Sequence, residues 1–311
     1  MEVILHLGAH RTASESFRHY LQANSKRLQR DGIGYWGPAP GKGGNQTRPA
    51  AVTRDQSPDQ QLGAVRARLL SNLDLAEQRG IRQLVISDPG VIGTLADNWA
   101  GARLYRGAGE RMARYCQAFG GRLTRVVLSI RSQDSYWSST AACMVSEGCT
   151  VPDKTVADAL ASRRRGWRDV VTDLACALPD VEMQVQPYES FGSMPEKILA
   201  AMTGIRDLPR RQAREWRNRA PGLPDLRKIL RHRGDDPETL PRGSGRWLPF
   251  DREQTMTLRE AYADDLYWLR SGAGGLATFI DEPGLARAGQ QLPGDPPTRG
   301  QSDGKDNRRL A

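Results

Sequence analysis

The apolar run at residues 124–130, Thr-Arg-Val-Val-Leu-Ser-Ile, constrains the fold more than any other feature of the sequence. The run is nearly continuous in Val, Leu and Ile. This pattern is typical of a central strand in a parallel sheet, which is buried on both faces. A sheet of that kind needs helices on both sides, so the run predicts an α/β protein.

Strand-like and helix-like segments alternate along the rest of the chain. Further apolar strands are expected at 3–7, 83–86 and 182–186, and helices at 14–30, 58–78, 107–118, 133–145, 166–177, 194–203, 208–219 and 252–270. Residues 34–60 are rich in Gly, Pro and Asn without periodicity, which predicts a long surface loop. The alternation predicts three α/β/α layers around a central, mostly parallel sheet with right-handed crossovers.

The chain is expected to form a single domain over residues 1–282. At 311 residues, a hydrophobic fraction of 38% still suffices for a sizeable core. From Pro283 onward Gly, Pro, Gln, Asp and Arg dominate the sequence. That composition predicts a disordered tail over residues 283–311.

The cysteines and the N-terminus bear on the compartment. Cys116, Cys143, Cys149 and Cys176 form no CxxC pair and have no metal-ligand spacing with histidine. They are therefore expected to be free thiols in a reducing compartment, and no metal is expected. The N-terminus does not resemble a signal peptide, and no run approaches the roughly 18 apolar residues of a membrane span. A cytoplasmic location is the expectation.

The formal charge of +9 raises the possibility of a nucleic-acid partner. Only six of the 45 basic residues are lysines, and the arginines are scattered along the chain. Few aromatic residues interleave with them, as stacking platforms for bases would require. A nucleic-acid partner is thus the less favoured interpretation, since an anionic small ligand or an acidic acceptor fits the charge as well.

The first predicted strand leads directly into a candidate anion site. Residues 5–17 read Leu-His-Leu-Gly-Ala-His-Arg-Thr-Ala-Ser-Glu-Ser-Phe. Backbone N–H groups at the start of the following helix would bind phosphate oxygens, and Arg11 adds a positive charge. Hydroxyl donors follow at Thr12, Ser14 and Ser16. The Gly-Lys-Ser/Thr ending of a Walker A loop is missing. The alternative is an ordinary turn in which Thr12 or Ser14 is the helix N-cap.

A second candidate anion site follows the central strand. Arg131 stands directly after the run 124–130, and serines follow on the next predicted helix. Ligands in open α/β sheets bind at the carboxyl ends of the strands. The alternative is that Arg131 pairs with an acidic neighbour such as Asp134.

Taken together, the two segments resemble the P-loop sulfotransferase family, which uses 3′-phosphoadenosine 5′-phosphosulfate (PAPS) as donor. Residues 10–16 are similar to the family's 5′-phosphosulfate loop, and Arg131 with Ser139 matches its 3′-phosphate pair. Residues 242–247, Arg-Gly-Ser-Gly-Arg-Trp, are a looser match to a late element around the 3′-phosphate. The resemblance implies a P-loop NTPase-like fold. It also implies a donor site formed by Arg11, Thr12, Ala13, Ser14, Ser16, Arg131, Ser139, Arg242 and Gly243.

The loop departs from the family pattern at three positions. Arg11 stands where the family usually has lysine, and a planar guanidinium is not a geometric equivalent of a compact ammonium. Ala13 replaces a glycine at a position where a positive φ would be costly. Glu15 replaces threonine; a carboxylate at ~4 Å from a phosphate costs on the order of 4 kcal/mol at an effective dielectric near 20. If Glu15 instead points outward, its negative charge interacts favourably with the positive end of the helix dipole.

The resemblance implies transfer of a sulfuryl group from PAPS to a hydroxyl or amine of a small-molecule, carbohydrate or lipid acceptor. Such an acceptor needs a general base. Asp88, after the strand 83–86, is the first candidate and His10 the second, whereas His6 is expected to be a hydrogen-bonded core residue. Two alternatives remain: a catalytically degenerate protein that binds a nucleotide or sulfated ligand, and a P-loop small-molecule kinase.

Overall fold

A parallel sheet forms the centre of the protein. The computed structural model describes residues 1–37, 58–162 and 165–282, and these contain a six-stranded sheet in the order β2-β3-β1-β4-β5-β6. The strands are β1 (Glu2–His6), β2 (Ile33–Trp36), β3 (Gln83–Ser87), β4 (Arg125–Ile130), β5 (Glu182–Pro187) and β6 (Thr278–Phe279). Every pairing between neighbours is parallel, which confirms the expected α/β class.

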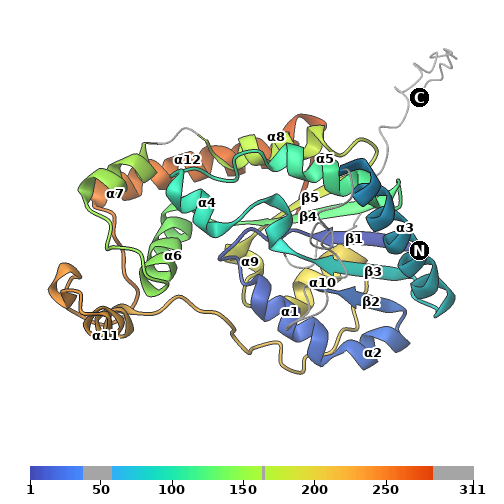
Figure 1. Cartoon of the computed structure of the whole chain (residues 1–311), viewed down its shortest axis with the longest axis horizontal. Coiled ribbons are helices and arrows are strands. Elements are labelled where there is room, and N and C mark those ends of the chain that lie inside the picture. Colours follow the sequence, from blue (N-terminus) through green and yellow to red (C-terminus); the bar gives the residue numbers. More distant parts are fainter. Residues whose placement is uncertain (38–57, 163–164, 283–311) are drawn as a thin grey trace, which may run out of the picture.

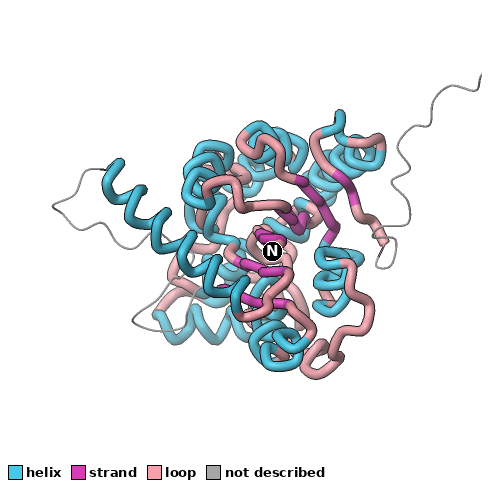
Figure 2. Tube along the Cα trace, turned by 90° about the vertical axis from the view of Figure 1, so that its right-hand side faces the viewer, coloured by secondary structure: helices cyan, strands magenta, loops and turns pink. Residues whose placement is uncertain are grey.

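Helices cover both faces of this sheet (Figures 1 and 2). The α-helices are α1 (Ser14–Ala23), α2 (Ser25–Arg30), α3 (Pro58–Gln78), α4 (Leu95–Ala100), α5 (Ala108–Phe119), α6 (Gln133–Ser146), α7 (Lys154–Ala161), α8 (Trp167–Cys176), α9 (Tyr188–Phe191), α10 (Pro195–Thr203), α11 (Leu223–Arg233) and α12 (Arg252–Arg270). Short 3-10 helices are η1 (Pro89–Ile92), η2 (Pro237–Thr239) and η3 (Ala273–Gly275). Helices α3, α5, α8 and α12 lie on one side of the sheet, and α1, α2 and α10 on the other.

The apolar run of β4 is buried on both faces, as its sequence predicts. All six residues of the strand are buried. Val126 and Leu128 pack into the core under α5 and α8, while Val127 packs into the opposite core under α1 and α10. Successive side chains of a strand point to opposite faces, so both faces need apolar residues here.

The strand order creates a crevice next to β1. From β1 the chain runs to β2 at one edge and returns through β3, whereas from β4 it runs to β5 and β6 on the other side. The connections that follow the neighbouring strands β1 and β4 thus diverge. In open α/β sheets, ligands bind outside the carboxyl ends of the strands at such a switch point.

Two predicted segments differ in detail. The helix predicted over 14–30 is two helices, because the Asn24 side-chain amide donates to the carbonyls of Tyr20 and Arg211 between them. The loop predicted over 34–60 begins with strand β2, an edge strand of four residues that contains Gly34. Residues 38–57 of that loop and the predicted tail 283–311 lie outside the described residues.

The helix predicted over 208–219 is wrong. Residues 208–222, here called the strap, form an irregular segment with left-handed backbone at Gln212 and Asn218. The strap is held against α1: the Tyr20 hydroxyl donates to the Pro209 carbonyl (2.8 Å), and the Arg217 N–H donates to Ser16 Oγ (2.8 Å). These contacts to α1 replace the internal hydrogen bonds of a helix.

Candidate functional site

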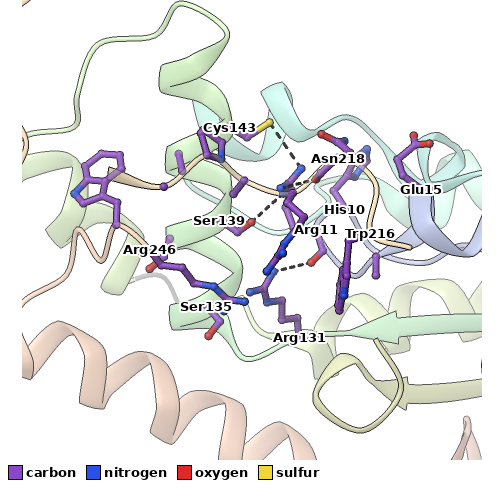
Figure 3. Close-up of a pocket in the computed structure, with 18 of the residues that line it drawn as sticks. His10, Arg11, Glu15, Arg131, Ser135, Ser139, Cys143, Trp216, Asn218 and Arg246 are labelled. Carbon is purple, nitrogen blue, oxygen red and sulfur yellow. Dashed lines mark hydrogen bonds between the residues drawn. The ribbon is translucent and has the colours of Figure 1, made fainter. Parts of the chain in front are cut away.

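A pocket of about 920 Å³ opens at the carboxyl ends of β1 and β4. Its walls come from the β1–α1 loop, helix α6, the strap and residues 245–248 (Figure 3). This volume is near the upper end for small-molecule sites, which range over ~300–1,000 Å³. The pocket is thus large enough for a nucleotide, and it lies where the strand order predicts a ligand.

The β1–α1 loop turns sharply under the pocket. The N–H of Ala9 donates to the Ser129 carbonyl (3.1 Å), which continues the pairing of β1 with β4. Gly8 has φ 43°, and a Cβ there would overlap Ser14 Oγ and the His6 ring. Arg11 and Ala13 are also left-handed, with φ of 65° and 66°. Left-handed backbone in residues other than glycine costs about 1–2 kcal/mol each, and such strain clusters at functional sites.

Helix α1 begins in this pocket without a conventional cap. Its N-cap is Ala13, and among the described residues no side chain caps it. The Thr12 hydroxyl donates to the Ala9 carbonyl (2.5 Å), and the Ser14 hydroxyl donates to the Gly8 carbonyl (3.1 Å). The alternative of Thr12 or Ser14 as N-cap is therefore wrong. The first-turn amides and the positive end of the helix dipole favour an anion here.

Arg11 crosses the pocket from the loop toward α6 (Figure 3). Its Nε donates to Ser139 Oγ (2.9 Å), and its Nη2 donates to the carbonyl of Asn218 in the strap (3.1 Å). Nη1 lies 3.9 Å from Cys143 Sγ. The guanidinium thus connects the loop, α6 and the strap through neutral acceptors.

Arg131 lies deeper, and only 6% of it is exposed. Its Nη1 donates to the Arg11 carbonyl (2.7 Å), and its guanidinium carbon lies 4.4 Å from the centre of the Tyr188 ring. Its Nε is buried without a hydrogen-bond partner in the described chain. Burial, and secondarily the charges of Arg246 and Arg11, lower the pKa of Arg131. The alternative pairing with Asp134 is wrong, because that carboxylate accepts from Arg259 at 2.8 Å.

The charges of the pocket are unbalanced. Within residues 1–37, 58–162 and 165–282, none of Arg11, Arg131 and Arg246 forms an ion pair. Glu15 also lines the pocket, but it pairs with Arg18, and its carboxylate points away from Arg11 (Figure 3). An unpartnered buried donor costs about 1–3 kcal/mol, and Arg131 Nε is such a donor. An anion would satisfy it.

Six of the eleven predicted site residues line the pocket and five do not. The lining includes His10, Arg11, Ala13, Ser14, Arg131 and Ser139. Thr12 is buried below it, and Ser16 Oγ accepts from the strap. The Arg242 side chain is 94% exposed and stands 3.7 Å from Glu238, while the Gly243 carbonyl accepts from Arg227. Neither Arg242 nor Gly243 lines the pocket.

Asp88, the first candidate for a general base, is also absent from the lining. It is buried at the end of β3, where its Oδ1 accepts from the N–H of Gly90 (2.9 Å) as the N-cap of η1. His6 is a core residue, as expected: its two ring nitrogens contact the hydroxyls of Ser87 (2.9 Å) and Ser129 (3.4 Å).

Several lining residues were not predicted from the sequence, and two of them bear on ligand binding. Trp216 in the strap lines the pocket and is 39% exposed, and Arg246 lines it four residues beyond the predicted Arg242. Trp216 falls in the segment for which a helix was wrongly predicted. An exposed tryptophan next to clustered arginines is the signal that could have identified it.

The fold and the pocket define an α/β protein with an arginine-lined pocket at the switch point of its sheet. Comparisons of the chain with protein-family models, curated proteins and solved structures found no match. In the part of the chain that the structure describes, no group of three or more His, Cys, Asp or Glu residues could hold a metal ion. None of the described helices has the length and apolar character required to cross a bilayer.

Proposed function

We propose that this chain binds PAPS in the pocket and transfers its sulfuryl group to a hydroxyl or amine of an acceptor. The observation that carries the proposal is the buried Arg131 Nε, which lacks a hydrogen-bond partner in the described chain, beside two further arginines without an ion pair. A donor with negative charge at both of its ends would neutralise all three. The phosphate-loop position of residues 8–15 between β1 and α1 supports a P-loop NTPase-like version of the fold.

The donor would occupy the pocket in a defined direction. The 5′-phosphosulfate would lie against Arg11 and the first-turn amides of α1, and the 3′-phosphate against Arg131, Ser139 and Arg246. Trp216, exposed at the wall, would offer its ring to the adenine. Sulfuryl transfer, like phosphoryl transfer, depends on in-line positioning and on stabilising developing charge. Arginines and helix amides supply both.

Of the two residues proposed as general base, only His10 lines the pocket. The Asp88 carboxylate is buried at the N-cap of η1 and is not among the lining residues. The four cysteines are free thiols, which supports a reducing, cytoplasmic compartment.

One observation favours a second candidate function, a protein that binds the nucleotide without catalysis. Arg11 already donates to Ser139 and to the Asn218 carbonyl. A catalytic Arg11 would have to exchange these contacts for the bridging oxygen of the donor. If it keeps them, the pocket still binds an anion through Arg131 and α1 but does not transfer the group.

The experiment that tests the proposal uses PAPS labelled with radioactive sulfur. The protein is incubated with it and separate pools of phenols, monosaccharides and amines, and label is followed in each acceptor. We expect the wild-type protein to transfer the label to an acceptor, and we expect Arg11→Ala to abolish this transfer. Retention of PAPS on the protein without transfer to any pool would favour the binding function. Absence of PAPS binding would contradict both.

A further inference from the structure

The peptide bond that follows Arg131 is held from both sides. Its carbonyl, which belongs to Arg131, accepts from the indole Nε1 of Trp167 (2.7 Å). Its N–H, which belongs to Ser132, donates to Oε1 of the Glu189 carboxylate (2.9 Å). In a planar trans peptide these two groups point in opposite directions. The two hydrogen bonds together therefore fix the orientation of this peptide plane at the end of β4.

Helix α12 holds both of the side chains that hold this peptide. Asp265 Oδ2 accepts from the backbone N–H of Trp167 (2.8 Å). The Tyr262 hydroxyl donates to Glu189 Oε2 (2.8 Å). Tyr262 and Asp265 are three residues apart on α12, a spacing that puts them on the same face of the helix. One face of α12 thus reaches both sides of a single peptide bond next to the pocket.

Asp265 is buried, and N–H groups surround its carboxylate. Besides Trp167, the N–H of Arg168 donates to Oδ1 (3.0 Å) and the Gln133 amide to Oδ2 (3.2 Å). A Cβ on Gly166 would lie 2.8 Å from either carboxylate oxygen, so the glycine permits this close approach. Burial raises the pKa of Asp265, while its N–H donors act in the opposite direction. Because α6 starts at Gln133 and α8 at Trp167, one carboxylate connects the starts of two helices to α12.

The side chain of Arg131 extends from the chain directly beside this fixed peptide. Its Nη1 donates to the Arg11 carbonyl (2.7 Å), and its Nε is buried without a hydrogen-bond partner in the described chain. Hydrogen bonds weaken steeply as their angle departs from linear, so Nε can bind an anion well only from one direction. A rotated peptide would turn the Cα–Cβ bond of Arg131 and move the guanidinium away from that direction.

We propose that α12 aims Arg131 at the anion in the pocket. Asp265 is a positioning residue that acts through Trp167. Tyr262 is a second positioning residue, and it acts through Glu189. None of these four residues lines the pocket, so they affect the anion only by way of Arg131. The identity of the anion as the 3′-phosphate of PAPS rests on the proposed function, whereas the orientation of Arg131 does not.

A double-mutant cycle with adenosine 3′,5′-bisphosphate tests this role. Trp167→Phe keeps a buried ring but removes the indole N–H that holds the Arg131 carbonyl. We expect it to weaken bisphosphate binding about fivefold, as for the loss of one hydrogen bond, with little effect on AMP. In an Arg131→Ala background the same change should alter the affinity by less than about twofold, because no guanidinium remains to be aimed. Equal factors in both backgrounds would overturn the proposal, since a general structural defect is additive.

Tyr262→Phe tests the second positioning residue, because it removes the hydroxyl that holds Glu189. It should also weaken bisphosphate binding, and only while Arg131 is present. Trp268→Phe is the matched control: it changes another tryptophan of α12, whose ring faces Arg168 at 5.3 Å. This variant should bind both nucleotides as wild type does. A loss in Trp268→Phe as large as that in Trp167→Phe would overturn the proposal, because any disturbance near α12 would then have the same effect.

The orientation of Arg131 is also measurable without a ligand. In ¹H–¹⁵N spectra its Nε–H signal is assigned by its absence in Arg131→Ala. We expect slow exchange with water in wild type, because Nε is buried, and several-fold faster exchange in Trp167→Phe and Tyr262→Phe. Unchanged exchange in both variants would overturn the proposal. A wild-type protein that does not bind the bisphosphate would instead contradict the proposed function, while the exchange rates still decide the positioning role.

Discussion

Arg131 is the residue on which the anion site depends most. It is nearly fully buried, and its Nε has no hydrogen-bond partner in the described chain, so a bound phosphate would supply the missing acceptor. We expect Arg131→Ala to weaken the binding of adenosine 3′,5′-bisphosphate by at least tenfold while binding of AMP changes little. Titration calorimetry with both nucleotides measures the difference.

Arg242→Ala is the matched control for Arg131→Ala. The sequence resemblance places Arg242 at the 3′-phosphate, but in the structure its side chain is almost fully exposed and outside the pocket lining. We expect no change in affinity for either nucleotide. Equal losses for the bisphosphate and AMP in Arg131→Ala would show that the 3′-phosphate assignment is wrong.

Ala13 carries strain that glycine would relieve. Its φ of 66° disfavours a residue with a Cβ by about 1–2 kcal/mol, whereas glycine adds ~0.5–1 kcal/mol of unfolded-state entropy. We expect Ala13→Gly to raise the free energy of unfolding in urea by about 0.5–1 kcal/mol. Ala263→Gly, in the middle of α12, should lower it by about 1 kcal/mol. A destabilising Ala13→Gly would contradict the left-handed N-cap.

Glu15 is less harmful to anion binding than its position in the loop suggests. It pairs with Arg18 on the same helix, and its carboxylate points away from Arg11. We therefore expect Glu15→Thr to change the affinity for adenosine 3′,5′-bisphosphate by less than about twofold. A gain of tenfold or more on titration would show that the carboxylate faces the bound anion.

At the scale of elements, β1 contains an ionisable residue that makes stability depend on pH. Burial, and to a smaller extent the charge of Arg18, lower the pKa of His6 from 6.5 to about 3. Between these values the unfolded chain binds a proton that the folded chain does not. His6 therefore makes stability fall as pH falls below about 6.5, by up to about 1.4 kcal/mol per pH unit.

Urea unfolding of His6→Asn between pH 7 and 5 tests this assignment. Compared with wild type, the variant should lose stability less steeply as the pH is lowered. Ser87→Ala removes a hydrogen-bond partner of His6 but keeps the imidazole, so it should lower stability and leave the pH dependence in place. An unchanged slope in His6→Asn would mean that the imidazole is not held neutral.

The helices and strands that could be predicted are those with a clear pattern of apolar residues in their own sequence. Strand β4 is recognisable because both of its faces are apolar, and helix α3 begins and ends where its pattern predicts. The edge strands β2 and β6 have only four and two residues, which is too short for a recognisable sequence pattern. They are strands because they pair with β3 and β5. The strap was predicted as a helix because its hydrogen bonds to α1 do not leave a local pattern.

The candidate site was predictable in part for the same reason. The loop and the pair Arg131–Ser139 lie at the ends of recognisable strands and on the helix that follows, and they line the pocket. Asp88 is followed by proline, a combination typical of a helix N-cap, and that signal argued against a catalytic base. In the structure Arg246 lines the pocket and Arg242 does not. Between them the backbone is left-handed at Gly243 and Gly245, which changes the direction of the chain.

At the scale of the whole molecule, the pocket exists only because distant segments meet. The loop after β1, helix α6, the strap and residues 245–248 are brought together at one end of the sheet (Figure 1). Of the arginines that line it, Arg217 pairs with Glu215, and the other four, Arg11, Arg131, Arg219 and Arg246, lack an ion pair among the described residues. Their positive charges therefore repel one another. Neutralisation by a ligand should therefore stabilise the entire fold.

The central claim, a site for a nucleotide with a 3′-phosphate, is tested most directly by a thermal-shift titration of the wild-type protein with adenosine 3′,5′-bisphosphate, AMP and ATP. At a hundredfold excess over the dissociation constant, a bound ligand stabilises the folded state by about 2.7 kcal/mol. We predict a rise in Tm of several degrees with the bisphosphate at concentrations where AMP and ATP have little effect. An equal shift with all three nucleotides, or no shift with any, would contradict the claim.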